Sequence, residues 1–352
     1  MAGYYYPPSL IIDQALKRIV QALNDRDAQF LFGAGMSASC EDRSGNKVPT
    51  GFELSIELLK EFFPPEMEEP PDKSRLEELA TYYPFECIVE AIEGLPGLGR
   101  LDLTNKLKNF FVEPDYSPSS AHIDFQSVCL WGGIPRFNQV FTTNFDLILE
   151  KILGDKLSAS ITEKNAKEIK KSIQKGKICI IHLHGRLEED DYKITEKDVY
   201  NKSFSVLRSE FRNALTTSDA FVFVGYSMND PDFRDIYMQY RNEILERNRV
   251  DKKTYVVNPV KSKHHYELGS KIWESRGAIL IPLESTKFFA RLKTMMESQL
   301  KRAFRVAAMA KYGYKDEFAF NEFVKEIADL FRISNEDAII FLNENKAPGS
   351  MK

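Results

Sequence analysis

Two glycines stand just after the first strongly apolar run of the chain, where a buried strand would end. The run covers residues 30–32, and the turn that follows reads Gly-Ala-Gly-Met-Ser at positions 33–37. Glycine lets a backbone turn sharply and approach a pyrophosphate closely. The same turn could be purely structural, so this motif alone leaves both a phosphate loop and a simple turn open.

A second apolar run, residues 140–142, is followed by polar side chains that could orient a sugar. Asn144 and Asp146 come just after it. An amide and a carboxylate at the end of a strand can hydrogen-bond a ribose or a carboxamide. Asp146 could instead cap the helix that we expect over residues 147–152, because Asp is a preferred N-cap residue.

A histidine follows the third apolar run, residues 178–181. His184 precedes Gly185, and histidine titrates near neutral pH and can serve as a general base. His182 lies two residues earlier on the same strand face, and it could equally be a packed, hydrogen-bonded core histidine. The other histidines lack such a placement and are expected to be structural or on the surface: His122, His264 and His265.

Two further turns carry hydrogen-bonding side chains. The sequence Gly-Tyr-Ser at 225–227 follows the apolar residues 221–224, and Asp230 comes shortly after it. Asp230 could orient another side chain or only form the turn. Asn258 follows the apolar run 254–257, where it could hydrogen-bond a ribose or close an Asx turn.

The elements that must position these residues follow a regular alternation. Six short runs are almost wholly apolar, and helical periodicity separates most of them. Strands that are apolar on both faces belong to parallel sheets covered by helices. We therefore expect an α/β, doubly wound, Rossmann-like fold with a mostly parallel six-stranded sheet. Ligands of such folds bind beyond the carboxyl ends of the strands, where the polar residues above lie. The runs are residues 30–32, 140–142, 178–181, 221–224, 254–257 and 278–281.

Two stretches depart from this alternation. Residues 64–137 are punctuated by prolines and mostly helix-like, which predicts an inserted helical subdomain. Residues 284–346 read as a C-terminal helical region after the last strand. The main domain is expected over residues 9–283.

Composition narrows the class of protein. The chain has 352 residues with 48 Lys+Arg and 52 Asp+Glu, a formal net charge of −4. This balance excludes a strongly basic nucleic-acid binder as a global description, and we expect no direct nucleic-acid binding. No apolar run approaches the roughly 18 residues of a membrane span, and the start of the chain does not resemble a secretory signal, so a cytoplasmic location is expected. No cysteine pair has metal-ligand spacing, so neither zinc nor a disulfide is expected at Cys40, Cys87, Cys129 and Cys179.

Taken in order, the motifs resemble those of one family. The series GAGxS, TxNxD, HG, GxS and then an Asn after an apolar strand resembles the NAD-contacting motifs of the sirtuin-like family, over roughly residues 28–283. The form Gly-Tyr-Ser-x-x-Asp-Pro-Asp is similar to the prokaryotic branch found in antiphage defence. The resemblance implies that NAD lies across the carboxyl ends of the strands.

The resemblance also implies a role for each matching residue. Asn144 and His184 would be catalytic. The residues near the pyrophosphate and the adjoining ribose would be Gly33, Ala34, Gly35 and Ser37. Those facing the nicotinamide ribose and carboxamide would be Thr143, Asn144 and Asp146, with Thr143 at the glutamine position of the family. Contacts to the phosphates and to the adenosine ribose would come from Gly225, Ser227 and Asn258.

Departures from the family pattern bear on the reaction. Deacylating sirtuins carry a four-cysteine zinc module between the HG and GxS motifs, and the stretch from His184 to Gly225 has no cysteine. A charged insertion, residues 41–47, also follows the GAGxS turn. These departures favour an NAD hydrolase (a glycohydrolase) that releases nicotinamide and ADP-ribose without a metal. The alternatives are a non-catalytic module that senses NAD or ADP-ribose and, further from the pattern, a protein deacylase.

Regulation is expected because free NAD depletion would harm the host. About seventy residues follow the catalytic region, too few for a large sensor domain. A homo-oligomer and a protein partner are therefore expected, and defence relatives team with a HerA-type ATPase, a short Argonaute or another trigger protein. The aromatic-rich ends of the chain could form contact surfaces or could only complete the monomer core.

Overall fold

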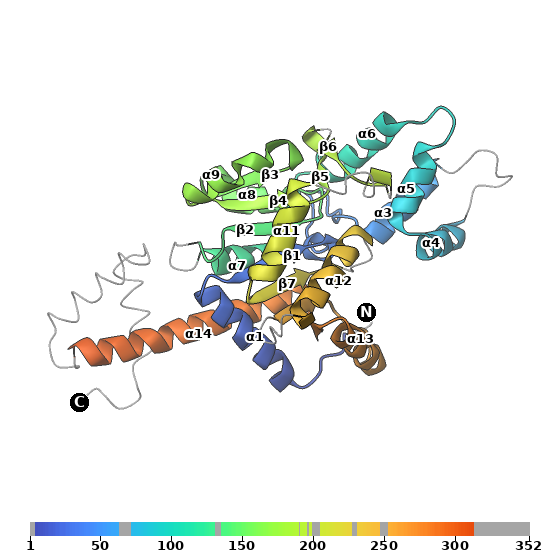
Figure 1. Ribbon diagram of the computed structural model, residues 1–352. Helices are drawn as coiled ribbons and strands as arrows, with labels where there is room; N and C mark the ends of the chain where they lie inside the picture. Colours follow the sequence, from blue (N-terminus) through green and yellow to red (C-terminus); the bar gives the residue numbers. More distant parts are fainter. Residues whose placement is uncertain are drawn as a thin grey trace.

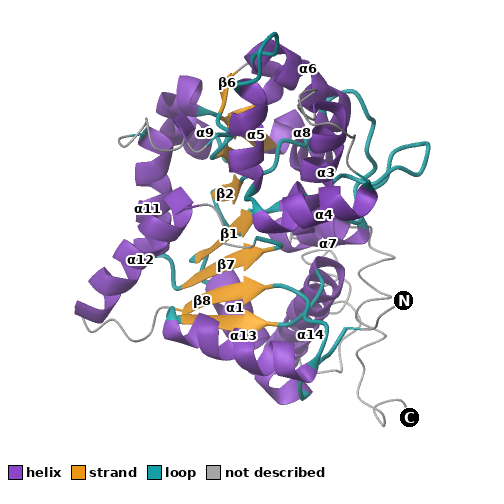
Figure 2. Ribbon diagram, turned by 90° about the vertical axis from the view of Figure 1, so that its right-hand side faces the viewer, coloured by secondary structure: helices purple, strands orange, loops and turns teal. Residues whose placement is uncertain are grey.

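A seven-stranded parallel sheet forms the centre of the protein (Figures 1 and 2). Its strand order is β3-β4-β2-β1-β7-β8-β9, and every neighbouring pair is parallel. The strands are β1 (Ala28–Phe32), β2 (Gln139–Thr142), β3 (Ser158–Ile161), β4 (Ile178–His182), β7 (Ala220–Val224), β8 (Lys253–Val257) and β9 (Ala278–Ile281). The computed structural model describes residues 4–62, 72–130, 135–189, 191–195, 197–198, 205–226, 231–246 and 253–312.

Helices cover both faces of the sheet, as Figure 2 shows. One core contains Phe30 and Phe32 of β1 and side chains of α1, α7, α8 and α14. Leu31, the intervening residue of β1, faces a second core that is built with α9, α11, α12 and α13. The strands are apolar throughout because each one buries alternate side chains in two separate cores. The helices on these faces are α1 (Ser9–Asn24), α7 (Ser120–Cys129), α8 (Ile148–Leu157), α9 (Ile169–Gln174), α11 (Val206–Thr217), α12 (Pro231–Glu246), α13 (Lys263–Ser275) and α14 (Ser285–Tyr312).

The doubly wound fold is confirmed, and all six predicted runs lie in strands of the sheet. The predicted number of strands is wrong, because β3 adds a seventh at one edge. Ser158, Ala159 and Ser160 do not form an apolar run, and only Ile161 is strongly apolar. An edge strand needs one neighbour, here β4, and its outer side needs no apolar cover. The pattern of fully buried strands therefore could not reveal it.

A third group of helices lies over the carboxyl ends of the strands, at one end of the molecule in Figure 1. Apolar side chains of α3, α5 and α6 form a separate core with Phe145 and with the segment after β4, which includes Leu187 and Tyr192. This segment also pairs two short antiparallel strands, β5 (Gly185–Arg186) and β6 (Asp191–Tyr192). The helices are α3 (Gly51–Phe62), α4 (Lys73–Tyr82), α5 (Phe85–Glu93) and α6 (Arg100–Phe111).

The predicted division into domains stays a prediction. The stretch expected as a helical insertion does contain α4, α5 and α6, but α7 of the same stretch packs against the main sheet through Phe125 and Val128. Of the predicted C-terminal helical region, α14 is described. Residues 313–352, with the aromatic residues expected to pack there, lie outside the described residues.

Candidate active site

The register of the central strands brings the candidate residues to one level. Phe32 of β1 pairs with Thr142 of β2, Thr142 pairs with His182 of β4, and Phe32 pairs with Val224 of β7 on its other side. Asn144, His184 and Tyr226 each follow the end of their strand by two residues, so they emerge from the central part of the sheet at the same edge. β2, β4 and β3 lie on one side of β1, and β7, β8 and β9 lie on the other. The strand order therefore reverses at β1, and this edge is the crevice where doubly wound folds bind ligands.

The glycines of two turns are explained by direct contact between their backbones. The short helix α2 (Ala34–Ser37) follows β1 and lies against the turn after β7. The Gly35 amide donates to the Gly225 carbonyl oxygen at 2.9 Å. A Cβ atom at Gly225 would lie 2.5 Å from the Gly35 Cα and from the Met36 nitrogen, and Gly225 has a φ of +63°. Only glycine fits this contact, which fixes the two turns as one unit at the site.

Hydrogen bonds join the Asn144 loop to α2. The Asn144 Nδ2 donates to the Ser37 Oγ at 3.2 Å, and the Asn144 backbone nitrogen donates to the Thr142 Oγ1 at 3.0 Å. Asp146 is 5% exposed and accepts hydrogen bonds from Ser37 and from the Ile148 backbone nitrogen, the latter at 3.2 Å. Asp146 thus accepts from the first amide of α8 while standing one residue before the N-cap position, Leu147, and it also links α8 to α2.

Burial raises the pKa of Asp146, while its hydrogen bonds from Ser37 and Ile148 act in the opposite direction. The pair formed by His182 and Glu150 lies close enough to influence it. His182 is 1% exposed, and its Nε2 lies 2.6 Å from Glu150 Oε1, which also accepts from Ser160. Burial raises the pKa of Glu150, but His182, the Ser160 hydroxyl and a backbone hydrogen bond together outweigh it, and the pKa lies below its usual range. His182 could have been a functional residue or a packed core histidine, and in the structure it is buried and hydrogen-bonded in the core.

His184 is half-buried beside an aromatic platform. Its ring centroid lies 6.3 Å from that of Phe145. Phe145 in turn contacts Phe111 of α6 and Tyr192 of β6, with centroids 5.9 Å and 6.1 Å away. Arg100 of α6 holds Tyr192 in place through a hydrogen bond to its carbonyl oxygen at 3.0 Å and through its position over the ring. The helical cover and the segment after β4 therefore support the His184 side of the site together.

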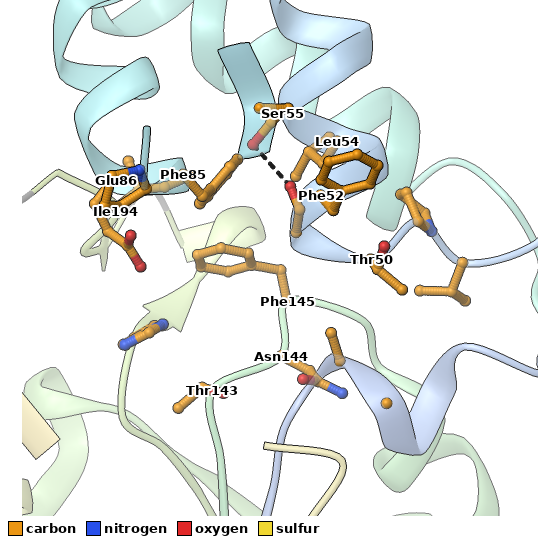
Figure 3. A pocket seen from close by; sticks show the side chains of 18 of the residues that line it. Thr50, Phe52, Leu54, Ser55, Phe85, Glu86, Thr143, Asn144, Phe145 and Ile194 are labelled. Carbon is orange, nitrogen blue, oxygen red and sulfur yellow. Dashed lines mark hydrogen bonds between the residues drawn. The ribbon is translucent and has the colours of Figure 1, made fainter. Parts of the chain in front are cut away.

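A cavity of about 730 Å³ opens between these loops and the helical cover. Figure 3 shows Thr143, Asn144 and Phe145 on one side and residues of α3 and α5 on the other. The volume falls in the range of cofactor and ligand pockets. The predicted site residues that line it are Ala34, Gly35, Thr143, Asn144, Asp146, His184 and Gly225.

Three of the predicted residues that the structure describes lie elsewhere. Gly33 packs against the turn at Gly225, and Ser37 is 1% exposed behind the cavity wall. Asn258 does not line the cavity, and its Nδ2 donates to the Tyr226 carbonyl oxygen at 2.9 Å, so it braces the turn after β7. Ser227, like Asp230, lies outside the described residues.

The residues that form the far wall of the cavity were not predicted from the sequence. This wall is lined by Leu54 and Ser55 of α3, Phe85 of α5 and Ile194 beyond β6. Tyr83 also lines the cavity. None of these residues belongs to a short motif. Residues 52–63 repeat apolar side chains at helical spacing, which predicts a helix, but no local signal says that this helix folds back over the carboxyl ends of the strands.

Within the described ranges, no group of three or more His, Cys, Asp or Glu residues could hold a metal ion. The predicted absence of zinc stays a prediction. None of the helices that can be described is both long and apolar enough to cross a membrane.

A model of the SIR2-like domain family matches residues 138–281. The matched stretch runs from β2 to β9 and includes both candidate catalytic residues, Asn144 and His184. This stretch of the chain is therefore similar to SIR2-like domains. The resemblance drawn from the motifs is therefore confirmed over this stretch, and the glycine turn at 33–37 lies before it.

Two curated relatives carry the same name. The chain is 26% identical over 240 residues to the NAD(+) hydrolase ThsA of Acinetobacter baumannii (strain 532279), covering 66% of this chain and 43% of that protein. It is 28% identical over 105 residues to the NAD(+) hydrolase ThsA of Bacillus cereus (strain MSX-D12), covering 29% and 22%. The chain thus spans less than half the length of either relative.

Solved structures of Sir2 proteins overlap the fold weakly. A Sir2 bound to the inhibitor EX-527, 2'-O-acetyl-ADP-ribose and a deacetylated p53 peptide is 14% identical, with a TM-score of 0.37 over 79% of this chain and 98% of that chain. A second Sir2 enzyme is 12% identical, with a TM-score of 0.38 over 82% and 99%. Structural similarity at this level is too weak to establish the fold. The doubly wound fold follows from the strand order described above.

Proposed function

We propose that the SIR2-like domain hydrolyses NAD, releasing nicotinamide and ADP-ribose. The observation that carries the proposal is the meeting of Asn144 and His184 in one cavity with two glycine turns at the carboxyl edge of the sheet. NAD then enters as substrate, and no metal takes part. The two ThsA relatives named NAD(+) hydrolases support this choice of reaction.

The reaction breaks the bond between the ribose carbon and the nicotinamide nitrogen. Nicotinamide is cationic in NAD and leaves as a neutral molecule, taking the bonding electron pair with it. Water supplies the new C–O bond and loses one proton. The protein must position the ribose, exclude other nucleophiles and admit one water.

The two catalytic residues would divide this work. His184 would polarise a ribose hydroxyl or activate the water, and Asn144 would hold that water or the ribose. The apolar wall formed by Phe145 and the α3–α5 helices would limit entry of bulk water. The backbone amides and small side chains of the glycine turns would lie along the phosphates.

We further propose that this activity serves bacterial antiphage defence in the cytoplasm and is released by a partner protein or a change of assembly. The support is the motif form at residues 225–232 and the toxicity of unregulated NAD loss. Part of the aromatic N-terminus contacts its own chain, since Tyr5 packs on Tyr266 with centroids 5.9 Å apart and the Tyr6 hydroxyl donates to Glu284 at 3.2 Å. Tyr4, 40% exposed, remains available for a homo-oligomer contact. Light scattering with activity measured in the same fractions tests this part.

One incubation separates the proposal from its alternatives. Purified protein is mixed with NAD, with and without an acetylated peptide, and the products are separated by chromatography. The proposal predicts nicotinamide and ADP-ribose without peptide. Binding of NAD without turnover, also after addition of the partner, would support the sensing module. Formation of acetyl-ADP-ribose only in the presence of peptide would support a deacylase.

A further inference from the structure

The chemistry of Asn144 depends on which end of its side-chain amide faces the cavity. The nitrogen end can only donate hydrogen bonds, and the oxygen end can only accept them. In the structure the Nδ2 of Asn144 points to the Ser37 Oγ, 3.2 Å away. The Oδ1 is consequently directed away from Ser37, toward the cavity that Asn144 lines.

Ser37 can enforce this orientation because its single hydroxyl hydrogen is already engaged. The Asp146 carboxylate accepts that hydrogen, which leaves only lone pairs of the Ser37 Oγ for Asn144. An Asn144 amide turned the other way would place two acceptor oxygens against each other. Asp146 is itself held by the backbone nitrogen of Ile148 at 3.2 Å.

The backbone of the loop is fixed by neighbouring contacts. The Asn144 nitrogen donates to Thr142 Oγ1 at 3.0 Å, and the Thr143 nitrogen donates to the Phe32 carbonyl oxygen at 3.0 Å. Ser37 belongs to α2, which packs against the turn at Gly225. The orientation of one side chain is thus tied to three strand ends: those of β1, β2 and β7.

We propose that Ser37 and Asp146 are positioning residues, which act in sequence to hold the Asn144 Oδ1 toward the cavity as a hydrogen-bond acceptor. The proposal rests on the proposed function, and it assigns Ser37 a role other than the NAD contact that the family resemblance implies. Ser37 is 1% exposed and does not line the cavity, so it reaches the reaction only through Asn144. An acceptor at this point takes a hydrogen from a water or a ribose hydroxyl and orients the oxygen that reacts.

Ser37→Ala tests this positioning role by separating the effect on turnover from the effect on NAD binding. We expect kcat for nicotinamide release to fall by about 10- to 100-fold, because a misplaced reacting group costs this much, while the NAD dissociation constant from calorimetry changes less than about threefold. Ser218→Ala is the matched control. Ser218 is also buried, at 3% exposure, its hydroxyl donates to the Ala214 carbonyl oxygen at 2.6 Å, and it lies at the end of α11. It should leave kcat unchanged.

Nuclear magnetic resonance of the side-chain amides gives a readout that does not require activity. The Asn144 signal is identified by its loss in Asn144→Ala. In Ser37→Ala the Asn144 amide should shift and exchange faster with solvent, and in Ser218→Ala it should stay in place. An unchanged Asn144 signal in Ser37→Ala, or a loss of NAD affinity that matches the loss of kcat, would overturn the proposed positioning of Asn144 by Ser37. A wild-type protein that releases no nicotinamide would instead count against the proposed function, while the amide signal still decides the positioning.

Discussion

The contact between the two glycine turns can be tested by adding a single methyl group. Gly225→Ala would place a Cβ 2.5 Å from the Gly35 Cα and from the Met36 nitrogen, well inside normal contact distance. The clash is with backbone, so no flexible side chain can move aside. Overpacking of this kind costs about 1–3 kcal/mol, and a non-glycine residue at φ +63° adds about 1–2 kcal/mol.

Gly176→Ala separates these two costs. Gly176 lies between α9 and β4 with a φ of +73°, and a Cβ there would meet no atom within 4 Å. It therefore has the same backbone strain as Gly225→Ala without the clash. The difference between the two variants should be about 1–3 kcal/mol of unfolding free energy, which is the cost of separating the turns.

Urea denaturation and nicotinamide release measure the two effects. Gly176→Ala should lose about 1–2 kcal/mol and keep its kcat/KM for NAD. Gly225→Ala should lose more stability and at least about tenfold in kcat/KM, because displaced turns carry α2 and Asn144 with them. Equal stability losses in the two variants, or full activity in Gly225→Ala, would refute the argument that close approach of the turns sets the site.

Three further predictions address groups around the site. Burial lowers the pKa of His122 to about 4, so between pH 6.5 and 4 the unfolded chain binds a proton that the folded chain does not. The free energy of unfolding should therefore fall by about 3 kcal/mol as the pH drops from 6.5 to 4. His122→Gln should flatten this pH dependence in urea titrations. Asp146→Ala should lose about 1 kcal/mol of stability with the helix cap, whereas Asp146→Asn keeps the cap, as melting curves would show; an equal loss in both variants would argue against capping. Elemental analysis of the purified protein should find no stoichiometric zinc, and one zinc per chain would contradict the prediction drawn from cysteine spacing.

The sheet could be predicted because each buried strand is marked by its own residues. Runs such as 221–224 are apolar at every position, since alternate side chains enter two cores. The parallel arrangement then placed Asn144 and His184 at one edge without any knowledge of their contacts. The edge strand β3 escaped prediction because its burial depends on one neighbour and its sequence is mostly small and polar.

The details of the site depend on contacts between distant segments, and no local pattern records those. Asn144 and Ser37 are 107 residues apart in sequence, so their hydrogen bond could not be read from either motif. The far wall at Phe85 is formed by helices that return over the sheet, and the fold-back follows from the third core rather than from periodicity. Predictions for Ser227 and Asp230 lie outside the described residues and stay predictions.

The most direct test of the central claim is nicotinamide release from NAD by the wild-type protein and His184→Ala in parallel, with the protein partner added if the isolated chain is silent. Circular dichroism confirms that the variant is folded. We expect equimolar nicotinamide and ADP-ribose from the wild type and at least about a 100-fold lower rate from His184→Ala, in line with the loss of a general base. A folded His184→Ala variant that hydrolyses NAD at the wild-type rate would contradict the account.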